Sequence, residues 1–135
     1  MTANNFISTL PNIYYGFQTG VITYAAGSIL RITGGINPKS HYNVSTYTFT
    51  APSNCMIKIE VSVVIAANST GDISIVVYNG STVVGAPYII YLQKAFGAQT
   101  GAGMCVGACA SGDQLTITTI TACSIAMSSC IFTVL

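Results

Sequence analysis

The side chains that usually carry acid–base chemistry are scarce in this sequence. It has a single histidine, His41, and three carboxylates, Glu60, Asp72 and Asp113, which lie far apart along the chain. No Gly-x-Ser-x-Gly or phosphate-loop motif is present. Because an enzyme needs a poised acid, base or nucleophile, the sequence predicts a protein that is not an enzyme.

The carboxylates have structural interpretations that compete with chemical ones. Asp113 follows Gly112 and is expected to hydrogen-bond the backbone of a turn. Lys58 and Glu60 are two residues apart in a predicted strand, so they share a face and are expected to pair with neighbouring strands or subunits. A catalytic Lys–Glu pair is the alternative. A calcium site would require the fold to bring Asp72 and Asp113 together.

The cysteines form an odd set: Cys55, Cys105, Cys109, Cys123 and Cys130. Cys105 and Cys109 would lie on one face of one strand about 13 Å apart. A disulfide needs Cα atoms within about 7 Å, so these two cannot pair there. The odd number predicts reduced thiols that fill space as small apolar side chains. A metal site is the alternative, but no Cys-x-x-Cys spacing supports one. We therefore expect no metal and no cofactor.

Charge is almost absent from the composition. Charged residues make up 5% of the chain, against about 25% in ordinary soluble domains. The net charge of +1 predicts no nucleic-acid partner. Without a run of about 18 apolar residues, no membrane insertion by a helix is expected. The N-terminal residues show neither the basic start nor the apolar segment of a signal peptide. A surface buried against copies of itself, and polarity supplied by Thr, Ser and Asn, both account for the missing charge.

Alternating polarity predicts an all-β fold. From Ile57 to Ile65 every odd position is aliphatic, which indicates a half-buried strand. Asn79-Gly80 between apolar runs predicts a tight hairpin. The stretch 88–92 is apolar on both faces and is expected to be buried on both sides. The segment 34–38 and the glycine-rich segment 97–103 are expected to be loops.

These signals add up to one domain. Eight to ten short antiparallel strands at close spacing predict a jelly-roll β-sandwich over residues 17–135. Residues 1–16 show no clean period and are interpreted as a lead-in segment that extends from a stalk.

Several motifs then occur in a familiar order. Residues 42–52 read as a tyrosine-led strand that ends in phenylalanine and then Ala-Pro. Tyr78-Asn79-Gly80 follows as a hairpin, residues 110–115 contain a Gly-Asp turn, and a strand ends the chain. Over residues 42–135 this order resembles the C1q and tumour-necrosis-factor-like (TNF-like) jelly roll. Cys55 and Met56 stand where that family usually has glycine and an aromatic residue, so the chain resembles the divergent heads of viral fibres and spore-surface proteins.

The resemblance implies a homotrimer. A strand that is apolar on both faces needs a second covering layer, and a neighbouring subunit can supply one. The alternative is that the aromatic residues fill the chain's own sandwich. The candidates for the trimer interface are Tyr47, Phe49, Tyr78, Tyr91 and Phe132.

Two loops are candidates for ligand binding, because a β scaffold displays variable chemistry on its loops. Their amide and hydroxyl groups can hydrogen-bond a sugar, and their aromatic rings offer faces for its C–H surface. Plain solvated connections are the alternative. The candidates are Asn37, Lys39, His41 and Tyr42 in the loop 34–42, and Phe96, Gln99 and Thr100 in the segment 94–103.

The sequence thus predicts a homotrimeric head domain of a viral or phage fibre, or of a similar surface projection. It would sit on the virion surface and bind a host glycan or protein receptor. One alternative is a purely structural capsid, decoration or spore-coat protein. Another is a secreted signalling ligand of the C1q type, and a spore or cell surface is an alternative location.

Overall fold

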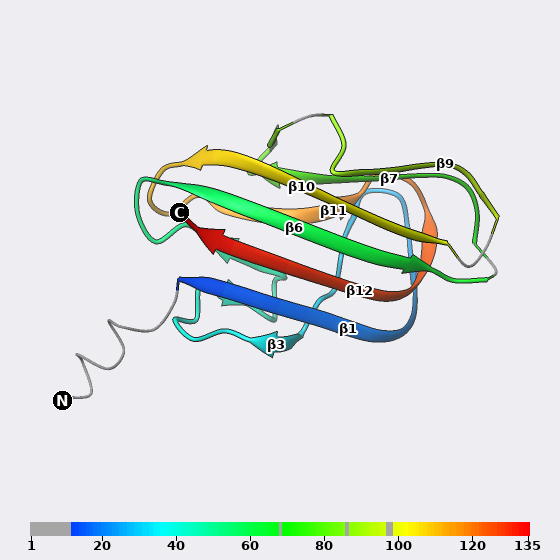
Figure 1. Cartoon of the computed structure of the whole chain (residues 1–135), viewed down its shortest axis with the longest axis horizontal. Coiled ribbons are helices and arrows are strands. Elements are labelled where there is room, and N and C mark those ends of the chain that lie inside the picture. The colour runs from blue at the N-terminus through cyan, green and yellow to red at the C-terminus, as the bar shows by residue number, and fades with distance from the viewer. Residues whose placement is uncertain (1–11, 68, 86, 97–98) are drawn as a thin grey trace.

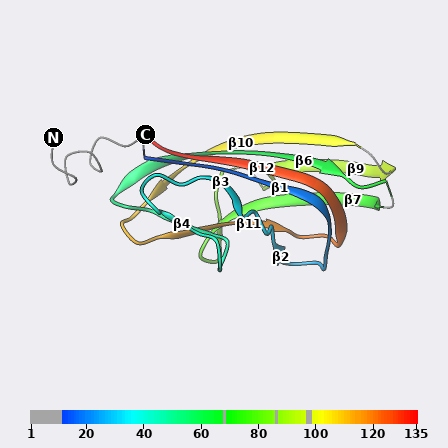
Figure 2. The ribbon, with the colours of Figure 1, turned by 90° about the horizontal axis from the view of Figure 1, so that it is seen from below.

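The computed structural model describes residues 12–67, 69–85, 87–96 and 99–135. These described residues form twelve β-strands and no helix, and the strands build two sheets that face one another (Figures 1 and 2). Dense β-branched residues favour strands over helices because they pack well on a pleated surface. The predicted all-β jelly-roll sandwich is confirmed.

The first sheet has five strands, of which four are long and the edge strand β3 is short. All of its strand pairs are antiparallel. Its order is β10-β6-β12-β1-β3. The bounds are β1 (Ile13–Tyr24), β3 (Gly34–Ile36), β6 (Cys55–Ile65), β10 (Thr100–Cys109) and β12 (Cys123–Val134).

The second sheet has seven strands and the main order β4-β5-β11-β7-β8. β2 also pairs with β11, and β9 pairs with β7 at the edge. The bounds are β2 (Ser28–Ile29), β4 (Tyr42–Asn43), β5 (Thr48–Thr50), β7 (Thr70–Asn79), β8 (Thr82–Val83), β9 (Ile90–Phe96) and β11 (Gln114–Thr119).

The core lies between the sheets. Polar and aliphatic residues alternate along β6, and its aliphatic side chains point into this core. Every odd position from Ile57 to Ile65 is at most 3% exposed, as predicted. Ile73, Ile75 and Val77 of β7 are also buried and belong to the same core. Full burial of each such side chain contributes roughly 1.5–3 kcal/mol to stability.

Aromatic rings fill one part of this core. Phe49 and Phe132 come from opposite sheets, are both 0% exposed, and stack with centroids 4.7 Å apart. Tyr14 and Tyr42 stack at 3.9 Å. The Tyr42 hydroxyl donates to the carbonyl of Ile32 at 2.9 Å. The predicted trimer role of Phe49 and Phe132 is wrong, because each sheet already covers the other's ring.

The interior side of β10 is made of very small residues. A Cβ added to Gly103 would run into the backbone carbonyl of Ile89, and one added to Gly107 would press on Val84. Glycine is therefore required for the chain before β9 to approach β10. The predicted loop ends earlier than expected, since β10 begins at Thr100, and residues 97–98 lie outside the described residues.

Some local predictions are confirmed and others are not. β7 and β8 form the hairpin expected at Asn79-Gly80, with Gly80 at φ 61°. Gly34–Ile36 pairs with β1 as a strand, not as the expected loop. The stretch 88–92 is not buried on both sides: Ile90 is 3% exposed but Tyr91 is 48% exposed, because β9 is an edge strand.

The domain begins before the predicted boundary. β1 starts at Ile13 and pairs with β12 from its first residue, so residues 13–16 belong to the sheet. The rest of the predicted lead-in, residues 1–11, lies outside the described residues.

Candidate functional site

The outer face of the five-stranded sheet carries the even-numbered residues of β6. Met56 and Ser62 are exposed, and Lys58, Glu60 and Val64 are half-buried. β10 and β12 flank β6 in register, so Lys58, Glu60, Ser62 and Val64 each have a paired residue on both sides, and Met56 has one on β10. The composition of this face can therefore be read row by row across four strands.

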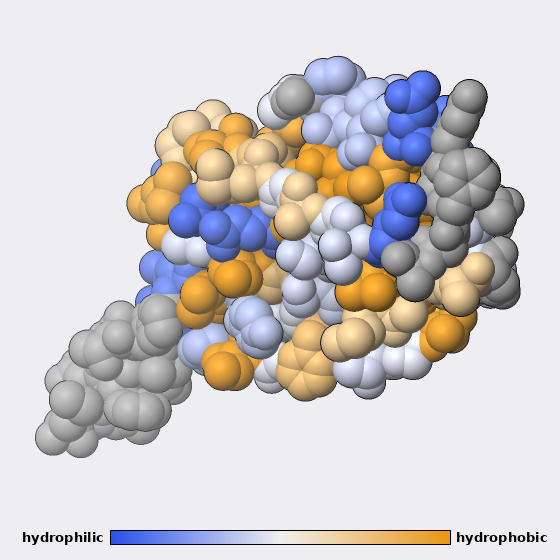
Figure 3. Space-filling view, turned by 45° about the vertical axis from the view of Figure 1, so that its right-hand side comes forward, coloured by the Kyte–Doolittle hydropathy of each residue, from blue (hydrophilic) through white to orange (hydrophobic). Residues whose placement is uncertain are grey.

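Several large apolar side chains are exposed on this face. Figure 3 shows apolar colour over much of the face in view, with strongly hydrophilic colour gathered in few places. We call the following set the apolar face: Tyr15 (40% exposed), Phe17 (45%), Met56 (44%), Met104 (59%), Val106 (39%) and Met127 (51%).

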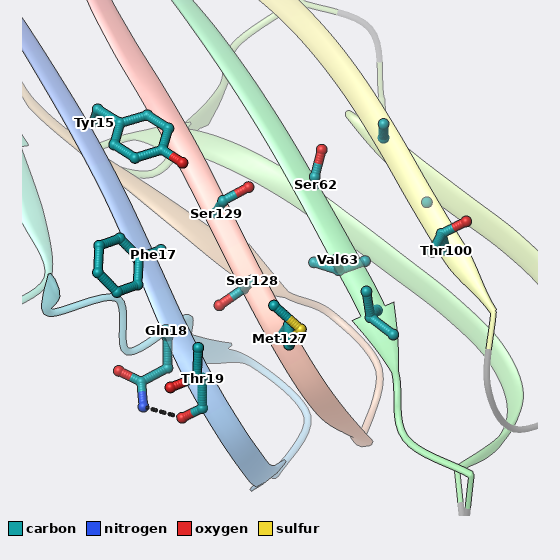
Figure 4. Close-up of a pocket in the computed structure, with 13 residues that line it drawn as sticks. Tyr15, Phe17, Gln18, Thr19, Ser62, Val63, Thr100, Met127, Ser128 and Ser129 are labelled. Carbon is teal, nitrogen blue, oxygen red and sulfur yellow. Dashed lines mark hydrogen bonds between the residues drawn. The ribbon is translucent and has the colours of Figure 1, made fainter. Parts of the chain in front are cut away.

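A row of small residues crosses the middle of the apolar face. Ala102 pairs with Ser62, Ser62 with Ser129, and Ser129 with Phe17. Larger residues lie in the rows on either side, including Met104 on one side and Met127 on the other. The small residues form the floor of a hollow with a volume of about 470 Å³. Figure 4 shows Tyr15, Phe17 and Met127 around it.

The charges on this face cancel one another. The Lys58 ammonium lies 3.6 Å from a Glu60 carboxylate oxygen, and the two side chains are 35% and 38% exposed. The sequence predicted that these two residues share a face. In the structure they pair with each other instead of with residues of neighbouring strands. An ion pair this exposed contributes little to stability. The face as a whole is nearly neutral.

Nucleophilic and metal-binding chemistry finds little support in the described part of the chain. The five cysteines are free thiols. Burial raises the pKa of Cys105, Cys109 and Cys123, and it raises that of Cys130 to about 12, which disfavours the reactive thiolate. No group of three or more His, Cys, Asp or Glu side chains gathers among the described residues.

Asp113 has the structural role predicted for it. Its Oδ2 accepts hydrogen bonds from the Ala110 backbone N–H at 2.8 Å and from Asn79 Nδ2 at 2.9 Å. These bonds to the charged form lower the pKa of the carboxyl. The described residues include no helix with the length and apolarity needed to cross a membrane.

Comparison with known proteins identifies the fold. Neither a protein-family model nor a curated protein matches the sequence. Among solved structures, Eiger TNF from S. frugiperda matches with a TM-score of 0.57 and 7% identity, over 92% of this chain and 93% of that one. Murine APRIL matches with a TM-score of 0.58 and 7% identity, over 90% and 99%.

The fold is a TNF-like jelly roll. At such low identity the likeness shows the fold alone, so the function must be argued from the residues of this chain. In this TNF-like jelly roll the five-stranded sheet bears the apolar face. Of the residues predicted to bind ligands, Asn37 follows its edge strand β3 and Thr100 begins its edge strand β10.

The loop 34–42 is held together by its own side chains. The Asn37 Nδ2 donates to the Tyr42 carbonyl at 2.8 Å, and the Tyr42 N–H donates to Asn37 Oδ1 at 3.3 Å. Tyr42 is 5% exposed and packs in the core. Its predicted contact with a ligand is therefore wrong, because both its ring and its hydroxyl are used inside the TNF-like jelly roll.

His41 is also tied to the scaffold. Its Nε2 lies 3.2 Å from Asn12 Oδ1, and its ring makes an edge contact with Phe49 at 5.8 Å. Burial, followed by the nearby Lys39 charge, lowers the His41 pKa and so favours the neutral ring. His41 and Lys39 remain predicted binding residues.

The structure does not bring the two predicted loops together. Residues 37–41 follow edge strand β3, whereas Gln99 precedes and Thr100 begins β10 at the opposite edge. Thr100 lines the hollow of the apolar face. Gln99 is exposed and its carbonyl accepts the Ile65 N–H at 2.7 Å. Phe96 is the last residue of β9.

The remaining trimer candidates lie outside the apolar face. Tyr47 and Tyr78 are half-buried, and the exposed Tyr91 donates to Asp72 Oδ2 at 3.2 Å. Sequence reasoning missed the apolar face itself. A sequence pattern in β10 could have indicated this face: Met104 and Val106 alternate with Cys105 and Cys109, so their side chains point to the opposite side of the strand.

Proposed function

We propose that this protein is a non-enzymatic head domain that assembles as a homotrimer through the apolar face. The observation that carries the proposal is the set of large apolar side chains exposed on one sheet. Covering such a side chain removes its apolar surface from water and contributes roughly 1.5–3 kcal/mol when burial is complete. Contiguous exposed patches of this kind mark interaction sites.

A second copy of the chain is the occupant that the charges favour. The apolar face carries one cation and one anion that already pair, Lys58 and Glu60. A partner surface must therefore be nearly neutral as well, and this chain has a net charge of +1 with 5% charged residues. An interface rich in apolar and aromatic residues and poor in charge is typical of homo-oligomers.

A ring of three copies needs two different surfaces on each chain. The apolar face is one, and the exposed edge at β9 offers the other. Tyr88 and Tyr91 lie there with ring centroids 5.3 Å apart and are 43% and 48% exposed. Tyrosine pairs of this kind supply large contact areas with few rotatable bonds. The family resemblance supports the same assembly.

We assign the trimer to the tip of a viral or phage fibre, or to a similar surface projection, where it attaches to a host receptor or glycan. Its surface supports this because polarity comes from Ser, Thr and Asn and not from charge. Such groups recognise sugars by hydrogen bonding. A purely structural capsid, decoration or spore-coat role remains the second candidate, since the apolar face would serve self-assembly alone.

Binding assays separate the two candidates. The purified assembly is applied to a glycan array and to host cells, beside a variant with residues 37–41 replaced by Gly and Ser. Attachment predicts binding by the wild type. Immunogold labelling of intact particles then locates the protein. A protein that is present on the particle but binds no cell and no glycan would be structural.

A further inference from the structure

A second hollow lies at the end of the sandwich, where the chain leaves β1 and enters β2. Its volume is about 600 Å³. We call it the Arg31 hollow, and its lining residues include Thr23, Tyr24, Ser28, Ile29, Arg31 and Tyr47. None of these residues belongs to the apolar face or to the Tyr88 and Tyr91 pair, the two surfaces proposed for assembly.

Arg31 is held in place by a buried tyrosine. Its guanidinium carbon lies 5.2 Å from the centroid of the Tyr24 ring, and Tyr24 is 2% exposed. The Arg31 backbone N–H also donates to the Tyr24 hydroxyl at 3.1 Å. Stacking on an aromatic face orients a guanidinium while its N–H donors stay in the plane, free to point outward.

The chain's own carboxylates are engaged elsewhere. Glu60 pairs with Lys58, Asp72 accepts from Tyr91, and Asp113 accepts from Asn79. The planar fork of a guanidinium matches a carboxylate in a two-bond geometry. An exposed arginine with an oriented fork therefore suits a carboxylate brought by a ligand.

Tyr47 enters the hollow in a strained conformation. Its φ of 57° lies in the left-handed region, which is unfavourable for a residue with a large side chain. Asn43 holds this turn: its Oδ1 accepts the Ser45 N–H at 2.8 Å and its carbonyl accepts the Tyr47 N–H at 2.7 Å. Strain of this kind persists where the surroundings fix it, and it is concentrated at functional sites.

The remaining lining supplies hydroxyl groups beside the guanidinium and the ring. Thr23 Oγ1 lies 3.0 Å from Ser124 Oγ, so it is oriented, and Ser28 lies across the turn. A sugar presents hydroxyls to such groups and a C–H face to an aromatic ring. A carboxylate on that sugar would meet Arg31.

We propose that the Arg31 hollow binds an acidic sugar unit of a glycan, with Arg31 on its carboxylate and Tyr47 against its ring. This inference rests on the proposed attachment function and names the ligand class. It also places recognition away from the loops 34–42 and 94–103.

The test uses the assembled protein and two small probes, methyl glucuronide and its neutral counterpart methyl glucoside. Saturation-transfer NMR should show glucuronide binding at least tenfold tighter than glucoside binding. Arg31→Gln should abolish the preference and Arg31→Lys should reduce it. Gln114→Glu, which removes the same unit of net charge at an exposed site outside the hollow, should retain it.

Each contrary outcome has a distinct meaning. Equal binding of both probes, or undiminished glucuronide binding by Arg31→Gln in an intact assembly, would overturn the inference. Displacement of glucuronide by an equal concentration of acetate would show an anion site without sugar recognition, which also contradicts it. If the glycan array is positive but insensitive to Arg31→Gln, attachment stands and only this inference fails. A negative array removes both.

Discussion

The two sheets of this protein have similar inner faces and different outer faces. Both inner faces are apolar, as Ile59 of β6 and Ile117 of β11 illustrate. On the outer face of the seven-stranded sheet, β11 presents Thr116 and Thr118, in register with Tyr78 and Val76. Val76 is covered by its surroundings at 1% exposure. This sheet exposes the aromatic Tyr91 at its β9 edge. The outer face of the five-stranded sheet instead exposes aromatic and methionine side chains across four strands.

The difference teaches how a β-sandwich signals assembly. Residues whose side chains point between the two sheets show only that each sheet has a core, which every stable sandwich needs. Residues whose side chains point away from the core contact either water or a partner chain. Their polarity therefore indicates which sheet another chain covers. By this criterion the outer face of the five-stranded sheet is the main surface of the proposed assembly, and the seven-stranded sheet contributes its β9 edge.

The largest expected effect separates the core phenylalanines from the phenylalanine on the apolar face. Phe132→Ala should lower the free energy of unfolding by about 3–5 kcal/mol, because it leaves a cavity beside Phe49. Phe17→Ala should change it by about 0.5 kcal/mol or less, since Phe17 is exposed in the single chain. Urea unfolding measures both.

That comparison needs a single-chain background, because assembly itself raises apparent stability. Ser62→Arg, which places a charge at the centre of the apolar face, is the suitable background. Equal losses for Phe132→Ala and Phe17→Ala would show that the inner and outer faces have been assigned wrongly.

A somewhat smaller effect is expected on the two sides of β10. Gly103→Ala should cost about 1–3 kcal/mol of unfolding free energy in the same background, because the new Cβ meets the Ile89 carbonyl and the backbone must shift. Ala102→Ser, on the outer side of the same strand, should stay within about 0.5 kcal/mol. If Gly103→Ala is as mild as Ala102→Ser, β9 does not press on β10 as described.

The smallest effect concerns the turn that joins the second sheet to β10. The folded-state pKa of Asp113 lies below its usual value, so its carboxylate stabilises the fold above the unfolded pKa. This contribution is lost as the pH falls through the folded pKa, in the acid range below about 4. Asp113→Asn should therefore flatten the acid limb of the stability–pH curve, measured by urea unfolding at each pH. An unchanged limb would contradict the assignment.

Much of the fold could be predicted because it depends on local patterns. The alternation in β6 and the Asn79-Gly80 turn each determine a nearby geometry. The burial of Phe49 and Phe132 could not be predicted, because it depends on which two sheets meet face to face. The error at residues 88–92 has a similar origin, since a doubly apolar strand also occurs at an edge that a partner covers.

The candidate site was harder to predict than the fold. Tyr42 looked like a loop residue, yet its ring stacks on Tyr14 from a strand far away in the sequence. The apolar face is assembled from β1, β6, β10 and β12, so its residues are scattered between positions 15 and 127. The pairing of four strands brings these residues together on one surface, and no short sequence motif predicts that pairing.

The central claim is that the apolar face holds three copies together, and light scattering behind size exclusion at micromolar concentration tests it most directly. The account predicts that the wild type has three times the 14.0 kDa mass of the chain. Ser62→Arg should reduce this to a single chain, whereas Thr116→Arg on the outer face of the other sheet should remain trimeric. A wild type of 14.0 kDa, or a Ser62→Arg variant that stays trimeric, would contradict the account.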